Sequence, residues 1–148
     1  MKATEVDKFT VNPDETAFSL PIRVYYQDTD AGGVVYHSTY LDFMERARYE
    51  WLRQLGFEIH SLIQVHKVIF MVRSLSIEYL KPALLDDLLH VTAKAVEIGS
   101  SRIAISQQVL RGPATLVNAT VQAVCVGAVS LKPVRVPAPL RHQLGKHS

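Results

Sequence analysis

The chain has 148 residues, of which 48% are hydrophobic and 20% are charged, and its formal net charge is +2. These values are typical of a globular protein with one core, and they exclude a disordered or fibrous chain. Residues 1–18 lack the apolar run of a secretory signal, and the longest apolar run, 123–129, is too short to span a bilayer. We therefore expect one domain over 1–148, in the cytoplasm, with no membrane span.

The distribution of charge indicates which kinds of partner the chain could bind, and the cysteine content indicates whether a thiol could react. The last acidic residue is Glu97, so the final third is basic, which suits a phosphate-bearing ligand, an acidic protein or an anionic surface. The basic residues of the final third are Arg102, Arg111, Lys132, Arg135, Arg141 and Lys146, with His142 and His147. The alternative is that these basic residues are spread over strands and a tail and form no patch. No basic runs interleaved with aromatic residues occur, so we expect no nucleic-acid partner. The single cysteine, Cys125, lies in an apolar run and is expected to be buried and unreactive.

The first expected elements are a strand and a helix. Residues 18–26 are rich in β-branched and aromatic side chains, which is typical of a strand. From Thr39 the apolar residues recur at three- and four-residue steps, which predicts a helix of about four turns that ends at Gly56. The predicted apolar face consists of Tyr40, Phe43, Met44, Ala47, Trp51, Leu52 and Leu55.

Strands are expected to make up most of the rest of the chain. Short turns at Gly99 and Gly112 separate them, so neighbouring strands should pair antiparallel. The expected strands span 67–80, 88–98, 102–110 and 115–129. One long helix with a run of strands is an α+β arrangement.

The ends of the chain and its last strand carry two further expectations. Segments 1–17 and 133–148 are expected to be irregular tails, since prolines at 133, 137 and 139 interrupt the second. The strand over 115–129 is apolar or small on both faces, and one helix can cover only one of them. The other face should therefore meet a second subunit, so we expect an oligomer.

The stretch "DTDAGGVVYHSTY", residues 28–40, brings two acids, two glycines and a histidine together just before the predicted helix. Asp28, Asp30 and Gly33 match three positions of a calcium loop, but Gly32 and Thr39 stand where ligands are required. Histidines and the lone cysteine are not spaced as zinc ligands. We therefore expect no metal.

Two interpretations of this stretch remain open from the residues alone. Aspartates beside glycines form turns, and a strand-to-helix connection needs one. However, Gly32 and Gly33 also allow the backbone to approach a ligand closely, and a helix that begins near Ser38 offers unpaired N–H groups. These groups could hold an oxyanion beside a carboxylate, which is the arrangement of an acyl-transfer site.

A family resemblance favours the second interpretation. The stretch "RVYYQDTDAGGVVYHSTYLDFMERARYEWLRQLG" (23–56) closely resembles the signature of hotdog-fold acyl-CoA thioesterases of the 4-hydroxybenzoyl-CoA thioesterase family. More narrowly, it is similar to the bacterial subgroup associated with the Tol-Pal system, and the similarity continues through "VRSLSIEYLKPALLDDLLHV" (72–91). The resemblance implies a hotdog fold, in which a five-stranded antiparallel sheet wraps around one long helix, and a homodimer or homotetramer.

The resemblance also implies roles for individual residues. Asp30 is the catalytic carboxylate, which either attacks the thioester carbonyl or activates a water molecule. The backbone N–H of His37 supplies the oxyanion hole, and its side chain either assists or makes a structural hydrogen bond. Asp28 fixes the turn. The residues expected to contact the substrate are Gly32, Gly33 and Tyr36.

The expected activity is hydrolysis of an acyl-CoA, or of an acyl group on an acyl carrier protein, without a metal or redox cofactor. Three alternatives remain. Another hotdog subgroup has its carboxylate on the helix, where Glu45 or Glu50 could serve, although their spacing to Arg48 and Arg46 predicts ion pairs. The second alternative is a hotdog dehydratase, which uses a histidine with an acid on the helix, but the Pro-Gly-rich run that dehydratases carry is missing here. The last alternative is a binding subunit for acyl-CoA or acyl carrier protein with little turnover.

Overall fold

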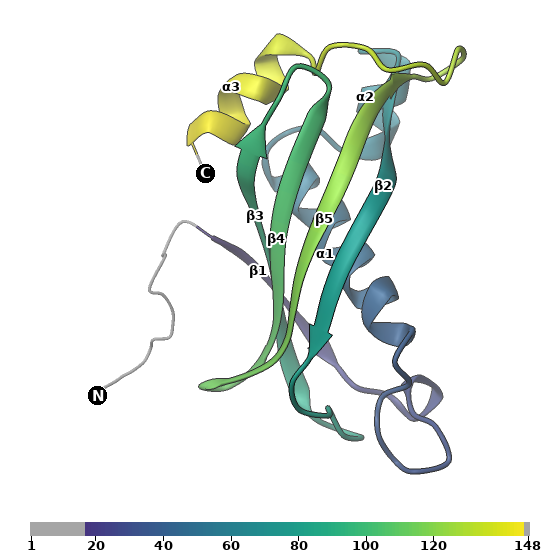
Figure 1. Cartoon of the computed structure of the whole chain (residues 1–148), viewed down its shortest axis with the longest axis vertical. Coiled ribbons are helices and arrows are strands. Elements are labelled where there is room, and N and C mark those ends of the chain that lie inside the picture. The colour runs from purple at the N-terminus through teal and green to yellow at the C-terminus, as the bar shows by residue number, and fades with distance from the viewer. Residues whose placement is uncertain (1–16, 147–148) are drawn as a thin grey trace.

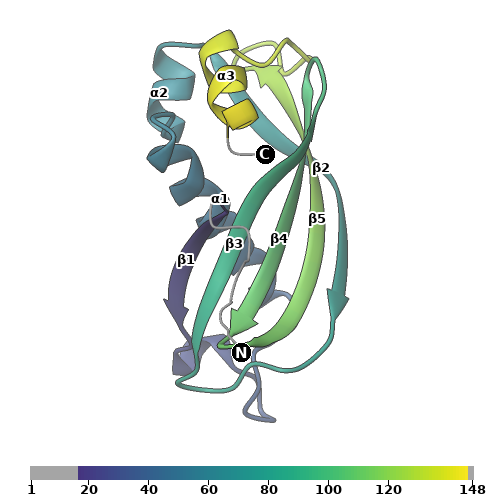
Figure 2. The same ribbon diagram turned by 90° about the vertical axis from the view of Figure 1, so that its left-hand side faces the viewer.

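The computed structural model describes residues 17–146 (Figures 1 and 2). Its five strands form one antiparallel sheet in the order β1-β3-β4-β5-β2, so β1 and β2 are the edge strands. The strands are β1 (Phe18–Arg23), β2 (Val68–Tyr79), β3 (Leu88–Ile98), β4 (Arg102–Arg111) and β5 (Ala114–Gly127). The four longer strands lie within one or two residues of their predicted bounds.

Helix α1 (Thr39–Gln54) lies against one side of the curved sheet, as Figure 2 shows. Its buried residues follow the predicted spacing of three and four, and they are Tyr40, Phe43, Met44, Ala47 and Trp51. Phe43 and Met44 are fully buried in a cluster with Leu89 and Val91 of β3. Burial of each such side chain contributes about 1.5–3 kcal/mol, which holds the helix to the sheet. A long helix wrapped by a five-stranded antiparallel sheet is the hotdog fold, so the predicted α+β fold class is confirmed.

The predicted end of this helix is also confirmed. Helix α1 gives way at Leu55 to Gly56, whose φ of +92° lies in the left-handed region that favours glycine. The expected first strand is shorter than predicted. It ends at Arg23, and a short 3₁₀ turn, η1 (Tyr26–Asp28), takes the chain toward the loop that precedes α1.

The expected irregular tail over 133–148 is wrong for most of its length. Residues Ala138–Lys146 form helix α3, and its Leu140 and Leu144 are fully buried. The two leucines are four residues apart, so they share one helix face, while Pro139 lies in the first turn, where proline is tolerated. Residues 1–16 of the other predicted tail lie outside the described residues.

A third helix, α2 (Ile59–Gln64), follows α1 directly. It contributes Leu62 to a second buried cluster, which also holds Trp51 of α1 and the two leucines of α3. Figure 1 shows α2 and α3 at the same end of the molecule, away from the start of α1. In the part of the chain that the structure describes, none of the helices is long and apolar enough to cross a membrane.

The predicted apolar outer face of the strand over 115–129, which is β5, is only partly present. One face of β5 is buried through Ala119, Val121 and Ala123, but the polar Asn118, Thr120 and Gln122 occupy the middle of its other face. The expectation of a strand that is apolar on both faces is therefore wrong for this middle portion. Exposed apolar residues occur instead on the edge strand β2, at Met71, Val72, Leu75 and Tyr79.

Candidate active site

Residues 28–37 form a closed loop just before α1 (Figure 1, bottom). Thr29 and Val35 form an isolated antiparallel bridge across the base of the loop. Inside it, the Asp30 N–H donates to the Val34 carbonyl at 2.9 Å and the Gly33 N–H donates to the Asp30 carbonyl at 3.0 Å. Gly33 has a φ of +81°, which a residue with a Cβ adopts only at a cost. The second glycine of the motif is therefore required by the backbone of this loop.

Asp28 fixes the turn, as predicted. Its side chain is buried, and one carboxylate oxygen, Oδ2, accepts the Tyr25 N–H at 2.8 Å. Its carbonyl oxygen accepts the Tyr36 N–H at 3.0 Å. These two bonds join Tyr25, which follows β1 by two residues, to the far side of the loop, so the side chain and the backbone of Asp28 both stabilise the turn.

Asp30 lies in a different environment from Asp28. It is exposed, and its Oδ1 accepts the Gly32 N–H at 2.8 Å. A Cβ at Gly32 would come within 3.2 Å of that oxygen, so a side chain at position 32 would crowd the carboxylate. Among residues 17–146, none donates a hydrogen bond to the other carboxylate oxygen, Oδ2. Asp30 therefore keeps one carboxylate oxygen available for chemistry.

His37 marks the junction between the loop and α1. The carbonyl before it, on Tyr36, accepts the Thr39 N–H at 2.8 Å, and its own carbonyl accepts the Tyr79 hydroxyl at 2.9 Å. Within the described range, the His37 N–H has no hydrogen-bond acceptor. The His37 and Tyr36 rings are exposed and lie 4.5 Å apart between centroids. An N–H without a partner at the start of a helix can receive an oxyanion.

A cavity of about 290 Å³ lies beside this junction. Its lining residues come from the loop, from the first turn of α1 and from the end of β2, and they are Val35, His37, Tyr40, Tyr79, Leu80, Lys81 and Pro82. Of the predicted site residues, His37 therefore lines this cavity. Asp30, Gly32, Gly33 and Tyr36 stand on the exposed loop next to it.

The segment after β2 braces the loop, and sequence reasoning missed this role. The Ala83 carbonyl accepts the Val35 N–H at 2.9 Å, while the Ala83 N–H donates to the Tyr40 hydroxyl at 3.0 Å. Burial raises the pKa of that Tyr40 hydroxyl above its ordinary value. The similarity over 72–91 already included this segment, but no pattern in the residues indicated that it would meet the loop.

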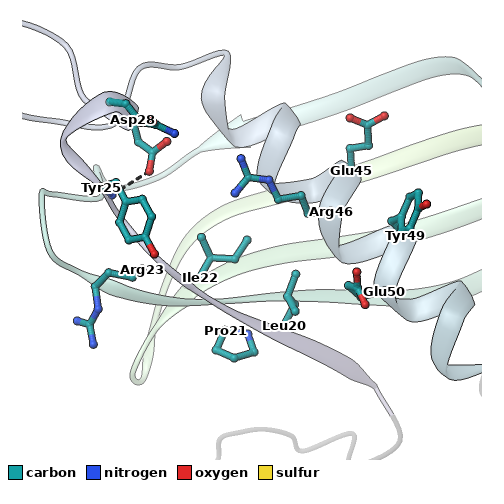
Figure 3. Close-up of a pocket in the computed structure, with 11 residues that line it drawn as sticks. Leu20, Pro21, Ile22, Arg23, Tyr25, Asp28, Glu45, Arg46, Tyr49 and Glu50 are labelled. Atoms are coloured by element: carbon teal, nitrogen blue, oxygen red, sulfur yellow. Dashed lines mark hydrogen bonds between the residues drawn. The ribbon is translucent and has the colours of Figure 1, made fainter.

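The two glutamates on the helix line a larger groove of about 730 Å³ between β1 and α1 (Figure 3). Glu45 and Glu50 lie on its α1 side together with Arg46. The expected ion pairs of these glutamates with Arg48 and Arg46 are not formed among the described residues. Instead, Glu50 pairs with Arg53 at 3.3 Å.

Arg48 instead joins a buried polar network. Its Nη1 donates to the Gln107 Oε1 at 2.9 Å, and burial lowers the pKa of the Arg48 guanidinium. Gln107 is fully buried, and its Nε2 donates to the carbonyls of Met44 and Thr92, each at 3.1 Å. This network therefore ties α1 to strands β3 and β4.

The basic residues of the final third do not all lie in one patch, because Arg111 is far from Arg102. Arg102 and Arg111 are the first and last residues of β4, which places them about 30 Å apart. Arg111 donates to the Asp87 carboxylate at 2.7 Å. Partial burial opposes ionisation of Asp87, but the bonds from the Leu84 N–H and from Arg111 hold its pKa below the ordinary value.

Within 17–146, no three His, Cys, Asp or Glu side chains are grouped to hold a metal ion.

Comparison with known proteins identifies the family. The model of the family described as "Thioesterase-like superfamily" matches residues 24–144. The chain belongs to the thioesterase-like superfamily. The match includes the loop, α1, the brace after β2 and most of α3, so the thioesterase-like region contains every part of the candidate site.

Individual thioesterase-like relatives are similar over most of their length. "Acyl-CoA thioesterase YbgC" of Haemophilus influenzae is 44% identical over 127 residues, which cover 86% of this chain and 93% of the relative. "Acyl-CoA thioester hydrolase YbgC" of Escherichia coli O157:H7 is 42% identical over 123 residues, covering 82% and 91%. A solved structure, a probable thioesterase from Bartonella henselae, superposes with a TM-score of 0.79 at 37% identity and covers 82% of this chain and 99% of that one.

Proposed function

We propose that this chain is an acyl-CoA thioesterase that hydrolyses a thioester to a free acid and CoA. The observation that carries the proposal is the likeness to relatives named as acyl-CoA thioesterases, at 44% identity over 93% of one of them. The exposed loop supports it, because a carboxylate oxygen of Asp30 and the N–H of His37 lie on the same short loop and neither has a hydrogen-bond partner within the described residues. These are the two groups that thioester hydrolysis needs.

In the proposed reaction, Asp30 either attacks the thioester carbonyl or takes a proton from a water molecule that attacks it. The carbonyl oxygen becomes an oxyanion, which accepts a hydrogen bond from the His37 N–H. Collapse of the oxyanion breaks the C–S bond, and the CoA thiolate leaves and takes up a proton. If Asp30 is the nucleophile, water then hydrolyses the acyl–Asp30 anhydride. Gly32, Gly33 and Tyr36 are proposed to contact the substrate from the exposed side of the loop.

The same site fits an acyl group on acyl carrier protein, because the chemistry at the thioester is identical. Release of free thiol from a panel of acyl-CoAs, with short, long and aromatic acyl groups, tests the proposal and defines the acyl preference. Continuous turnover of any member supports it. Tight binding of every member without thiol release would instead show a binding subunit.

The narrower likeness to the Tol-Pal-associated subgroup and the cytoplasmic location stay predictions.

We propose further that two copies of the chain associate along β2. This edge strand has 12 residues, and no strand within residues 17–146 pairs with its outer side. It leaves 47% of Met71 and 53% of Val72 exposed. Long exposed edges with apolar side chains tend to pair with another strand. Tyr79 of the same strand lines the cavity at His37, so a second copy on β2 would also cover the candidate site.

A further inference from the structure

Tyr79, the last residue of β2, reaches the start of α1. Its hydroxyl donates to the His37 carbonyl at 2.9 Å, although the two residues are 42 positions apart in the chain. Its ring lies beside the ring of Tyr40, with 5.6 Å between centroids, and both rings line the cavity of about 290 Å³. The contact therefore joins the edge strand to the residue that carries the proposed oxyanion donor.

Two peptide groups meet at the Cα of His37, and each has its carbonyl held. The Tyr36 carbonyl accepts the Thr39 N–H, which fixes the peptide group that contains the His37 N–H. The His37 carbonyl accepts the Tyr79 hydroxyl, which fixes the next one. Because a trans peptide is planar, holding a carbonyl oxygen also sets the direction of the N–H on the other side of the bond. Both planes around His37 are therefore restrained.

We propose that Tyr79 is a positioning residue for thioester hydrolysis. Its hydroxyl restrains the backbone on the far side of the His37 Cα, so that the His37 N–H stays directed at the oxygen of the thioester. This inference rests on the proposed function, since it needs the His37 N–H to be the oxyanion donor. A donor stabilises an oxyanion most when it is already oriented before the charge develops. Loss of the Tyr79 hydroxyl therefore lowers kcat without removing a substrate contact.

The variant Tyr79→Phe isolates this role, because it keeps the ring and its packing on Tyr40 and removes only the hydroxyl. The matched control is Tyr49→Phe on α1, where the residue is 40% exposed and the hydroxyl bonds to none of the described residues. Both variants are assayed with a good acyl-CoA substrate at a temperature where circular dichroism shows them to be folded. We expect Tyr79→Phe to lower kcat by roughly 3- to 10-fold with KM within about twofold, and the control to match the wild type.

Three results would overturn the role of Tyr79: an unchanged kcat, a raised KM with an unchanged kcat, or an equal loss in the control. Asp30→Asn in the same assay separates this inference from the proposed function. If Asp30→Asn loses turnover while Tyr79→Phe keeps it, only the role of Tyr79 is wrong. If Asp30→Asn keeps full turnover, the proposed site is wrong and the role of Tyr79 falls with it.

Discussion

Asp28 and Asp30 lie two residues apart, but their carboxylates do different work. Asp28 is 7% exposed and its Oδ2 accepts the Tyr25 N–H at 2.8 Å, whereas Asp30 is exposed and, among residues 17–146, its carboxylate accepts only the Gly32 N–H of its own loop. The buried carboxylate of Asp28 stabilises the fold, and the exposed carboxylate of Asp30 is accessible to a substrate. This difference leads to the first prediction.

The variant Asp30→Asn should lower kcat by roughly 10²-fold or more, with little change in KM or in the thermal midpoint Tm, because it removes the anion but keeps the acceptor for the Gly32 N–H. Asp28→Asn should keep most of the turnover, since the amide oxygen can still accept the Tyr25 N–H. Steady-state thiol release and thermal unfolding measure both variants. Loss of turnover in Glu45→Gln, with Asp30→Asn active, would point to a helix carboxylate instead.

The variant Gly33→Ala should destabilise the protein by about 1–2 kcal/mol, because its φ of +81° is costly for a residue with a Cβ. Urea unfolding measures this difference in the free energy of unfolding. Gly145→Ala in α3 is the control, since a helical glycine replaced by alanine should stabilise by up to about 1 kcal/mol. An unchanged midpoint for Gly33→Ala would show that the loop can adopt another backbone conformation.

The variant Gln107→Leu should destabilise the protein by about 2 kcal/mol or more. It leaves the Arg48 guanidinium without its side-chain acceptor and removes the side-chain donor to the buried carbonyls of Met44 and Thr92, which keep only their backbone donors. Gln108→Leu is the matched control, because the neighbouring side chain is only partly buried and bonds to Asn118. Chemical unfolding of the two variants should separate them clearly, and equal effects would contradict the importance of the buried network.

Stability should depend on pH through Asp87. The pKa of this carboxyl is held below its ordinary value of 3.8, so its ionised form favours the folded state. That contribution is fully present above the unfolded pKa and is lost as the pH falls through the lower folded pKa. Urea unfolding of Asp87→Asn should show a deficit at about pH 7 that shrinks at about pH 3. A deficit that is constant with pH would show that packing, not charge, is lost.

The association along β2 can be tested with a charge. Val72→Lys places an ammonium group on the exposed edge, where 53% of the valine is accessible in the single chain. Light scattering at micromolar concentration should report a dimer or tetramer for the wild type and a smaller species for the variant. Val129→Lys is the control, because that side chain is 96% exposed and lies on a loop outside the strands. A wild type that stays monomeric and fully active would contradict the association.

The sequence predicted the elements whose side chains repeat along the chain. The spacing of Tyr40, Phe43, Ala47 and Trp51 located α1, because burial on one helix face imposes that repeat. The same logic failed for α3, where three prolines concealed the four-residue step between Leu140 and Leu144. The hydrogen bonds from Tyr79 to His37 and from Ala83 to Tyr40 could not be predicted. They join residues that are more than 40 positions apart, and they depend on how β2 lies beside the loop.

The two buried clusters have consequences for synthesis of the chain. In the described structure, the cluster at the candidate site contains no residue beyond Ala119, whereas the cluster at the other end requires Leu140 and Leu144. Because a chain emerges from the ribosome with its N-terminus first, every residue of the site cluster emerges before Leu140 and Leu144 do. The cluster at the opposite end, which holds Trp51 and Leu62, stays incomplete until those two leucines emerge. A nascent chain should therefore reach a half-closed state, with its future site shaped and its far end exposed to chaperones.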